Sequence, residues 1–143
     1  MSAYLDASVL LPMLIAEPST ECLGAVDREL LISDFAAAEV ASALSRLVRM
    51  ALLTGADASE RLADFDTWRA TMSLHVDIEA SDARLAYIYV RRFELRLRAP
   101  DALHLAAARR LDASLITLDR RLATAATELG VAVEVPTTAR EPS

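Results

Sequence analysis

The chain has 143 residues and a formal net charge of −6, and its only cysteine is Cys22. A chain of this length suits one domain with a sizeable hydrophobic core. A single cysteine excludes an intramolecular disulfide and a cysteine-based zinc site, and the acidic balance argues against diffuse electrostatic binding of nucleic acid. No apolar run approaches the roughly 20 residues that span a bilayer, and the N-terminus lacks a secretory signal, so we expect a cytoplasmic protein.

Strand-like and helix-like segments alternate along the chain. Short buried or alternating apolar runs predict strands at residues 3–6, 30–32, 75–78, 114–118 and 131–135. Apolar spacing and capping residues predict helices at residues 7–17, 19–29, 33–53, 57–73, 81–96, 101–111 and 120–129. We expect Thr54 and Gly55 to end the long third helix, because glycine suits the left-handed position that follows a helix.

This alternation predicts an α/β fold, a three-layer sandwich in which helices flank a mainly parallel central sheet. Residues 1–135 are expected to form a single domain, and residues 136–143, which are polar and contain two prolines, a loose tail. The hydrophobic content of 54% suits tightly packed helices and leaves apolar surface for a partner.

Two predicted strands end in an aspartate. Asp6 follows the first strand and Asp119 follows the strand at 114–118, so each can simply cap the helix that comes next. In a parallel sheet, however, both side chains would point into the crevice at the carboxyl ends of the strands. There they would repel each other unless a cation lies between them.

Two further carboxylates belong to this hypothesis. Asp101 lies in the first turn of a predicted helix, where the helix dipole alone stabilises a negative charge by about 0.3–1 kcal/mol. Glu39 is harder to explain by a local role, because it stands among alanines and other apolar residues in a predicted helix, and acidic groups are rarely buried without a partner or a metal.

Carboxylates alone form an oxygen-only ligand set, which suits a hard divalent cation such as Mg²⁺, with Mn²⁺ accepted in similar sites. The chemistry that follows is metal-assisted hydrolysis of a phosphodiester. A local excess of positive charge supports a phosphate substrate, since residues 84–121 contain nine arginines and four acidic residues. These arginines can equally well solvate the outer faces of helices.

Four motifs follow one another along the chain: YLDASVLL at 4–11, AEVASAL at 38–44, APDALHLAAA at 99–108 and LITLDRRL at 115–122. In this order they resemble the signature of PIN-domain ribonucleases, and in particular of VapC-type toxins of bacterial toxin–antitoxin pairs. The resemblance covers nearly the whole chain.

The resemblance implies that four acidic residues bind the metal: Asp6, Glu39, Asp101 and Asp119. It implies that Ser8 and Thr117 support the first aspartate through their hydroxyls, with local capping or strand packing as the alternative. We expect an RNA substrate whose backbone is held by arginines near the site: Arg98, Arg109, Arg120 and Arg121. The resemblance also implies a homodimer and a VapB-type antitoxin partner.

Other polar and aromatic residues have simpler interpretations. We expect structural roles for His75 and His104, helix-end or strand-end roles for Asp34, Asp77 and Asp82, and core or dimer-surface positions for the aromatic residues Phe65, Trp68, Tyr87, Tyr89 and Phe93. A catalytically inert PIN fold that binds RNA or protein stays an alternative. A haloacid-dehalogenase-like phosphatase is disfavoured, because that family needs a second aspartate where this chain has Ser8.

Overall fold

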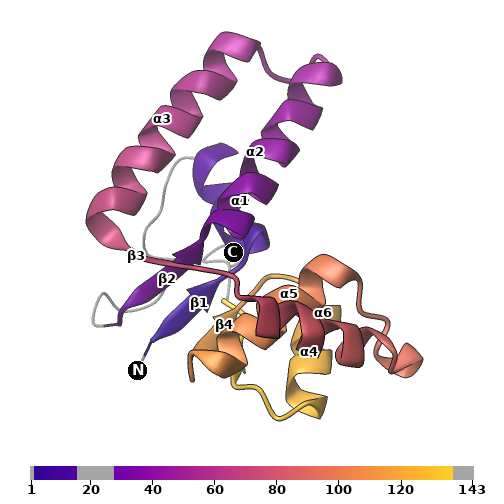
Figure 1. Ribbon diagram of the computed structural model, residues 1–143. Coiled ribbons are helices and arrows are strands. Elements are labelled where there is room, and N and C mark those ends of the chain that lie inside the picture. Colours follow the sequence, from indigo (N-terminus) through magenta and orange to yellow (C-terminus); the bar gives the residue numbers. More distant parts are fainter. Residues whose placement is uncertain (1, 16–27, 137–143) are drawn as a thin grey trace, which may run out of the picture.

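The computed structural model describes residues 2–15 and 28–136 of the chain. Strands and helices alternate along these residues (Figure 1). The strands are β1 (Ala3–Leu5), β2 (Leu30–Ser33), β3 (Leu74–Val76), β4 (Ser114–Ile116) and β5 (Val133–Glu134). The helices are α1 (Ala7–Ile15), α2 (Asp34–Arg49), α3 (Gly55–Met72), α4 (Ala80–Val90), α5 (Ala99–Arg110) and α6 (Arg120–Glu128), with a short 3₁₀ helix, η2, at Phe93–Leu95.

The strands form one sheet in the order β3-β2-β1-β4-β5, and every neighbouring pair is parallel. The central strand β1 pairs with β2 and β4, with Tyr4 opposite Leu31 on one side and Leu115 on the other. Because parallel strands end at the same edge, the residues that follow β1, β2 and β4 lie along one edge of the sheet. The predicted parallel sandwich is confirmed.

Helices cover both faces of the sheet. Alternate residues of β1 point to opposite faces, so Ala3 and Leu5 pack with α1, α2 and α3, whereas Tyr4 packs with α4, α5 and α6. In Figure 1, α2 and α3 form a long pair that extends away from the sheet, and α4, α5 and α6 lie together on its other side. Alanines at 106–108 of α5 are fully buried and let this helix approach its neighbours closely.

Polar residues at the ends of strands and loops start the helices that follow. The hydroxyl of Ser33 accepts the N–H of Ala36 at 3.1 Å and so caps α2. Thr54 accepts the N–H of Asp57 at 3.0 Å in the same way at the start of α3. Each such cap typically contributes about 1 kcal/mol to stability. Pro100 lies in the first turn of α5, where its missing N–H is harmless.

The helix predicted at 33–53 is shorter than expected. It ends at Arg49, because Ala51 adopts a left-handed φ of 58° and the Leu52 N–H turns back to the Leu47 carbonyl at 2.9 Å. Gly55 is the first residue of α3 and does not end α2, so that prediction is wrong. A non-glycine residue occupies the left-handed position here, and a rule based on glycine does not anticipate it.

The helix predicted at 81–96 also ends early. It stops at Val90, and the chain continues as η2 until Arg96, which adopts a left-handed φ of 55°. The predictions for Cys22, for most of the helix at 19–29 and for the tail beyond residue 136 lie outside the described residues.

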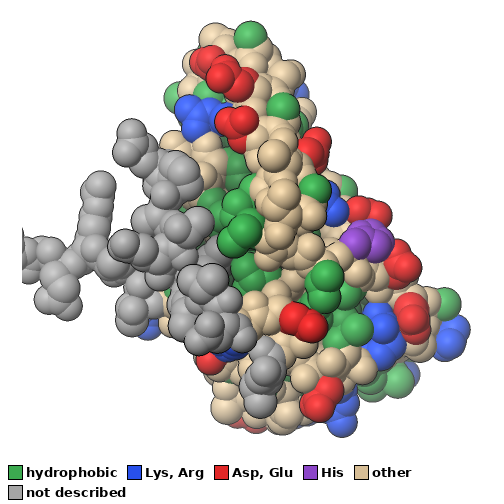
Figure 2. Space-filling model, turned by 90° about the vertical axis from the view of Figure 1, so that its left-hand side faces the viewer, with side chains coloured by type: hydrophobic (Ala, Val, Ile, Leu, Met, Phe, Trp, Pro, Cys, Tyr) green, Lys and Arg blue, Asp and Glu red, His purple; other side chains and the backbone are tan. Residues whose placement is uncertain are grey.

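None of the helices within residues 2–15 and 28–136 has the length and apolar character needed to cross a membrane. The predicted aromatic group divides: Phe65 and Tyr89 are buried in the core, whereas Tyr87 and Phe93 are exposed. Hydrophobic side chains gather in the middle of the face shown in Figure 2. The larger exposed hydrophobic side chains include Met50, Leu52, Met72, Leu74, Tyr87, Ile88 and Phe93.

Candidate active site

Hydroxyl groups hold the carboxylate of Asp6, which directly follows β1 and is 5% exposed. Ser8 donates its hydroxyl to Oδ1 at 2.6 Å and its N–H to the same oxygen at 3.1 Å. Thr117, just beyond β4, donates its hydroxyl to Oδ2 at 2.6 Å. The hydroxyls of Ser8 and Thr117 therefore bond directly to the Asp6 carboxylate.

Among the described residues, no cationic side chain bonds to the Asp6 carboxylate. Within the described part of the chain, none of the salt bridges involves Asp6. Burial raises the pKa of the Asp6 carboxyl, and the hydrogen bonds from Ser8 and Thr117 lower it in part. A buried ionised carboxylate is ordinarily paired with a cation, so this arrangement favours binding of one.

Asp101 and Asp119 interact across the starts of α5 and α6. Burial raises the pKa of the Asp101 carboxyl, the Arg98 guanidinium lowers it, and the charge of Asp119 raises it again. Asp119 caps α6, because its Oδ1 accepts the N–H groups of Arg121 at 3.0 Å and Leu122 at 3.3 Å. The capping role weighed in the sequence analysis is thus confirmed, and it coexists with proximity to Asp101.

Glu39 projects from α2 toward α5, where its Oε1 is hydrogen-bonded to Nε2 of His104. His104 also lies near the carboxylates of Asp6 and Asp101. The sequence predicted a structural role for His104 but missed its bond to Glu39. The available signal was a histidine one helical turn after Asp101 in an otherwise apolar helix.

Of the four arginines predicted to contact RNA, three lie beside the carboxylates. Arg98 has its Nε 3.7 Å from Oδ2 of Asp101. Arg120 and Arg121 are exposed at the start of α6, directly after Asp119. Arg98 therefore neighbours Asp101 in space, and Arg120 and Arg121 neighbour Asp119 in the chain.

The remaining arginines of α5 are used elsewhere. Arg109 lies about 12 Å along the helix axis from Asp101, and it donates to the Leu129 carbonyl at 3.1 Å. The structure therefore does not bring Arg109 to the site. Arg110 donates from Nε and Nη2 to the two carboxylate oxygens of Asp82, each at 3.0 Å. This ion pair, which the sequence analysis did not anticipate, accounts for part of the basic segment.

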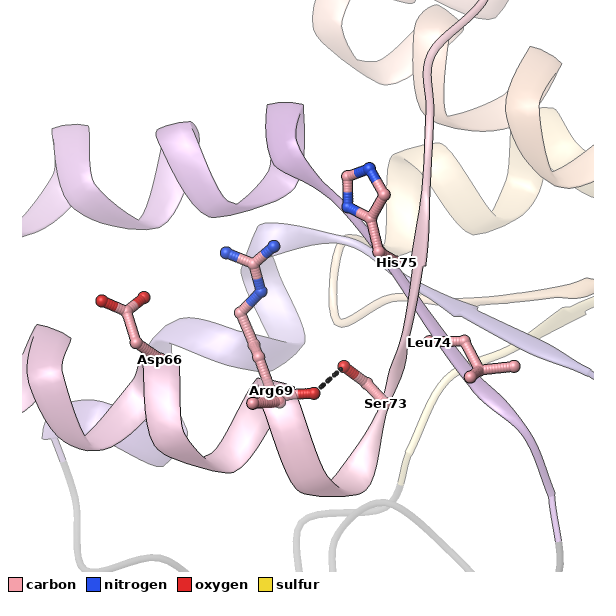
Figure 3. Close-up of a pocket in the computed structure, with 6 residues that line it drawn as sticks. Asp66, Arg69, Ser73, Leu74 and His75 are labelled. Atoms are coloured by element: carbon pink, nitrogen blue, oxygen red, sulfur yellow. Dashed lines mark hydrogen bonds between the residues drawn. The ribbon is translucent and has the colours of Figure 1, made fainter.

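The described residues contain one group of three side chains whose ligand atoms lie within 4.8 Å of one another, namely Asp34, His75 and Asp77. His75 Nε2 lies 2.8 Å from Asp77 Oδ1, and Arg69 donates to Asp34 at 3.1 Å. The group is exposed at the ends of β2 and β3. Beside it lies an open pocket of about 370 Å³ (Figure 3), lined by Asp66, Arg69, Ala70, Ser73, Leu74 and His75.

Among the described residues, no three of the four predicted metal ligands have ligand atoms that all lie within 4.8 Å of one another. Mg²⁺ keeps several waters and is commonly held by one or two carboxylates, so the four need not converge on one point. Asp6 is buried and Asp101 is half-buried, and burial raises the pKa of each carboxyl. Both side chains offer only oxygen atoms as metal ligands. The residues present therefore fit a hard divalent cation.

Comparison with known proteins agrees with the motifs and the fold described above. The PIN domain family model matches residues 3–128. The chain is 33% identical over 136 residues to Ribonuclease VapC46 of Mycobacterium tuberculosis, covering 93% of this chain and 96% of that protein. Its fold is similar to that of VapBC2 from Rickettsia felis bound to a promoter DNA fragment, with a TM-score of 0.69, 15% identity and coverage of 96% of this chain and 100% of the other.

It is also similar to VapBC-5, a member of the VapBC family of toxin–antitoxin systems from Mycobacterium tuberculosis. That similarity has a TM-score of 0.61 and 26% identity, and it covers 96% of this chain and 100% of the other. The motifs, the parallel sandwich and the carboxylates at the strand ends agree with these matches. This chain belongs to the PIN domain family.

Proposed function

We propose that this protein is a metal-dependent endoribonuclease that hydrolyses RNA phosphodiester bonds, and that it is the toxin of a VapBC-type toxin–antitoxin pair. The observation that carries the proposal is the buried Asp6 carboxylate, whose hydrogen-bond donors among the described residues are the uncharged groups of Ser8 and Thr117. The 33% identical relative is named a ribonuclease, which supports RNA as the substrate class. We also propose that it acts in the cytoplasm.

The chain's own residues divide the work at the site. Asp6 and Asp101 bind the cation, Mg²⁺ or Mn²⁺, with Glu39 and Asp119 completing the negative crevice. When bound, the divalent cation supplies an activated water and stabilises the negative charge that develops on the phosphate. Ser8 and Thr117 fix the orientation of Asp6 through short hydrogen bonds.

The substrate backbone is held by Arg98, Arg120 and Arg121 at the mouth of the crevice. Because these contacts are electrostatic, affinity for RNA should fall as the salt concentration rises. Exposed hydrophobic side chains, such as Met50 and Leu52 at the end of the α2 and α3 pair, offer surface for an antitoxin and for a second copy of the chain. The toxin–antitoxin assembly of VapBC-5 supports this partner.

The direct test is cleavage of a labelled RNA with added Mg²⁺ or Mn²⁺. Asp6→Asn and Asp101→Asn should abolish cleavage, whereas Asp64→Asn, which changes an exposed carboxylate on α3, should leave it intact. Retention of metal-dependent cleavage in both site variants would show that the site assignment is wrong. Calorimetry with no heat of Mg²⁺ or Mn²⁺ binding would instead favour the inert PIN fold.

The toxin role needs a separate experiment. Expression of the wild-type protein should arrest growth, and co-expression of a small protein encoded beside it should relieve the arrest. Asp6→Asn should be harmless when expressed at the same level. Normal growth with an active ribonuclease would separate the enzymatic proposal from the toxin proposal and reject the latter.

A further inference from the structure

A buried chain of hydrogen bonds ends on Glu39. His104 has a side chain 2% exposed, and its Nδ1 lies 2.7 Å from the Tyr4 hydroxyl. The Tyr4 hydroxyl in turn lies 3.0 Å from the hydroxyl of Ser33, which accepts the N–H of Ala36. On the other side of the imidazole, Nε2 bonds to the Glu39 carboxylate.

The hydrogen-bonding capacities of these groups give the chain one direction. An ionised Glu39 only accepts, so Nε2 of His104 carries a proton, and in the neutral imidazole Nδ1 then accepts. Tyr4 must then donate to Nδ1, and Ser33 must donate to the Tyr4 oxygen. Burial raises the pKa of the Tyr4 phenol, so its hydroxyl keeps its proton at neutral pH. In this direction each donor and acceptor named here has a partner.

This chain of hydrogen bonds joins the elements that carry the site. Tyr4 belongs to β1, two residues before Asp6, and His104 belongs to α5, one turn after Asp101. Ser33 caps α2, the helix that carries Glu39. The ring of Phe35 stacks on the imidazole with centroids 5.4 Å apart, which further restricts its rotation.

We propose that His104 is a positioning residue, which Tyr4 and Ser33 lock in the Nε2–H tautomer so that it holds the Glu39 carboxylate toward the crevice. This inference rests on the proposed function. The Glu39 side chain is 30% exposed, so without this bond it would sample several rotamers. Partners of this kind, which orient a ligating group, typically change metal affinity or activity by about 10- to 100-fold.

The first test uses a matched pair of tyrosine variants. Tyr4→Phe removes the hydroxyl that orients His104, and Tyr89→Phe removes a hydroxyl from another tyrosine in the same core cluster. Tyr4→Phe should weaken Mn²⁺ binding, measured by calorimetry, by about tenfold. It should lower kcat with little change in KM for RNA, whereas Tyr89→Phe should change neither quantity.

The second test changes the imidazole itself. His104→Ala should weaken Mn²⁺ binding by about 10- to 100-fold, and His104→Gln, which keeps an N–H for Glu39, should recover part of that loss. ¹⁵N shifts of the His104 ring in the metal-free protein should report a proton on Nε2 and none on Nδ1. This measurement does not require any variant to fold.

The outcomes distinguish this inference from the proposed function. Wild-type protein that neither binds Mn²⁺ nor cleaves RNA contradicts the proposed function. Wild-type protein that does both, with Tyr4→Phe indistinguishable from Tyr89→Phe in affinity and kcat, overturns the positioning role. A proton on Nδ1 of His104 would overturn it as well.

Discussion

Two buried aspartates in this protein are stabilised in different ways. Asp82 is 2% exposed and receives two hydrogen bonds from the Arg110 guanidinium, so its charge is neutralised within the protein. Asp6 is 5% exposed and receives bonds from the hydroxyls of Ser8 and Thr117, which carry no charge. The first arrangement joins α4 to α5, and the second leaves a negative charge for a ligand to complete.

The largest expected effect comes from neutralising Asp6. Asp6→Asn should reduce RNA cleavage by about 10³-fold or more, because a bound metal contributes several kcal/mol to such reactions. Its melting temperature should stay equal to that of the wild type or rise, since an uncompensated buried charge is removed. Steady-state cleavage and thermal unfolding check the two parts. A destabilised Asp6→Asn would mean that this carboxylate is structural, like Asp82.

Breaking the ion pair between Asp82 and Arg110 should lower stability and leave RNA cleavage nearly unchanged. Arg110→Met leaves Asp82 buried without its cation and should lower the free energy of unfolding by about 2–3 kcal/mol. That is less than the roughly 3–5 kcal/mol of fully buried pairs, because the Arg110 side chain is 27% exposed. Denaturant unfolding measures the loss, and Asp82→Asn combined with Arg110→Met should recover part of it. Cleavage per folded molecule should stay within about twofold of the wild type.

Added metal should stabilise the folded protein only through the proposed site at Asp6. At a free Mn²⁺ concentration ten times the Kd, the wild-type protein should gain about 1.4 kcal/mol in free energy of unfolding. Asp6→Asn should gain much less, and Arg110→Met should gain as much as the wild type. Thermal unfolding with and without EDTA provides the measurement. Equal gains in all three proteins would indicate that the ion binds elsewhere, for example at Asp34, His75 and Asp77.

The smallest effect concerns pH in the metal-free protein. Burial raises the pKa of Asp6 above its ordinary 3.8, so the folded state binds this proton more tightly than the unfolded state. Stability from this group therefore falls as pH rises from 3.8 through the folded pKa. Asp6→Asn lacks this pH-dependent contribution. Its free energy of unfolding should therefore rise relative to that of the wild type across that pH range. Urea titrations in EDTA at several pH values would reveal a constant difference if Asp6 were not perturbed.

The parts of the fold that the sequence predicted have strong local signals. Short apolar strands that end in Asp6 and Asp119 predicted a parallel sheet with carboxylates at one edge, and the structure has this arrangement. The ends of helices were less predictable. Ala51 and Arg96 occupy left-handed positions that sequence rules reserve for glycine, so the residue types there did not predict where α2 and η2 stop.

Partners that are distant in sequence could not be predicted. Glu39 and His104 are 65 residues apart, and Asp82 and Arg110 are 28 apart, so no local pattern links them. The same limitation applies to Arg109. Its place in a basic segment suggested a phosphate contact, but helix periodicity takes it to the far end of α5, at the Leu129 carbonyl.

Asp119 caps α6 and adds a negative charge beside the other carboxylates, and a substitution can separate these two roles. One carboxylate oxygen starts α6 by accepting the N–H groups of Arg121 and Leu122. Serine and asparagine start helices as well as aspartate does, and threonine does so only slightly less well. Mutation to any of them would keep α6 intact while removing one negative charge from the crevice. We therefore expect substitutions at this position to adjust the activity of the proposed site without a folding penalty, whereas no such route is open at Asp6.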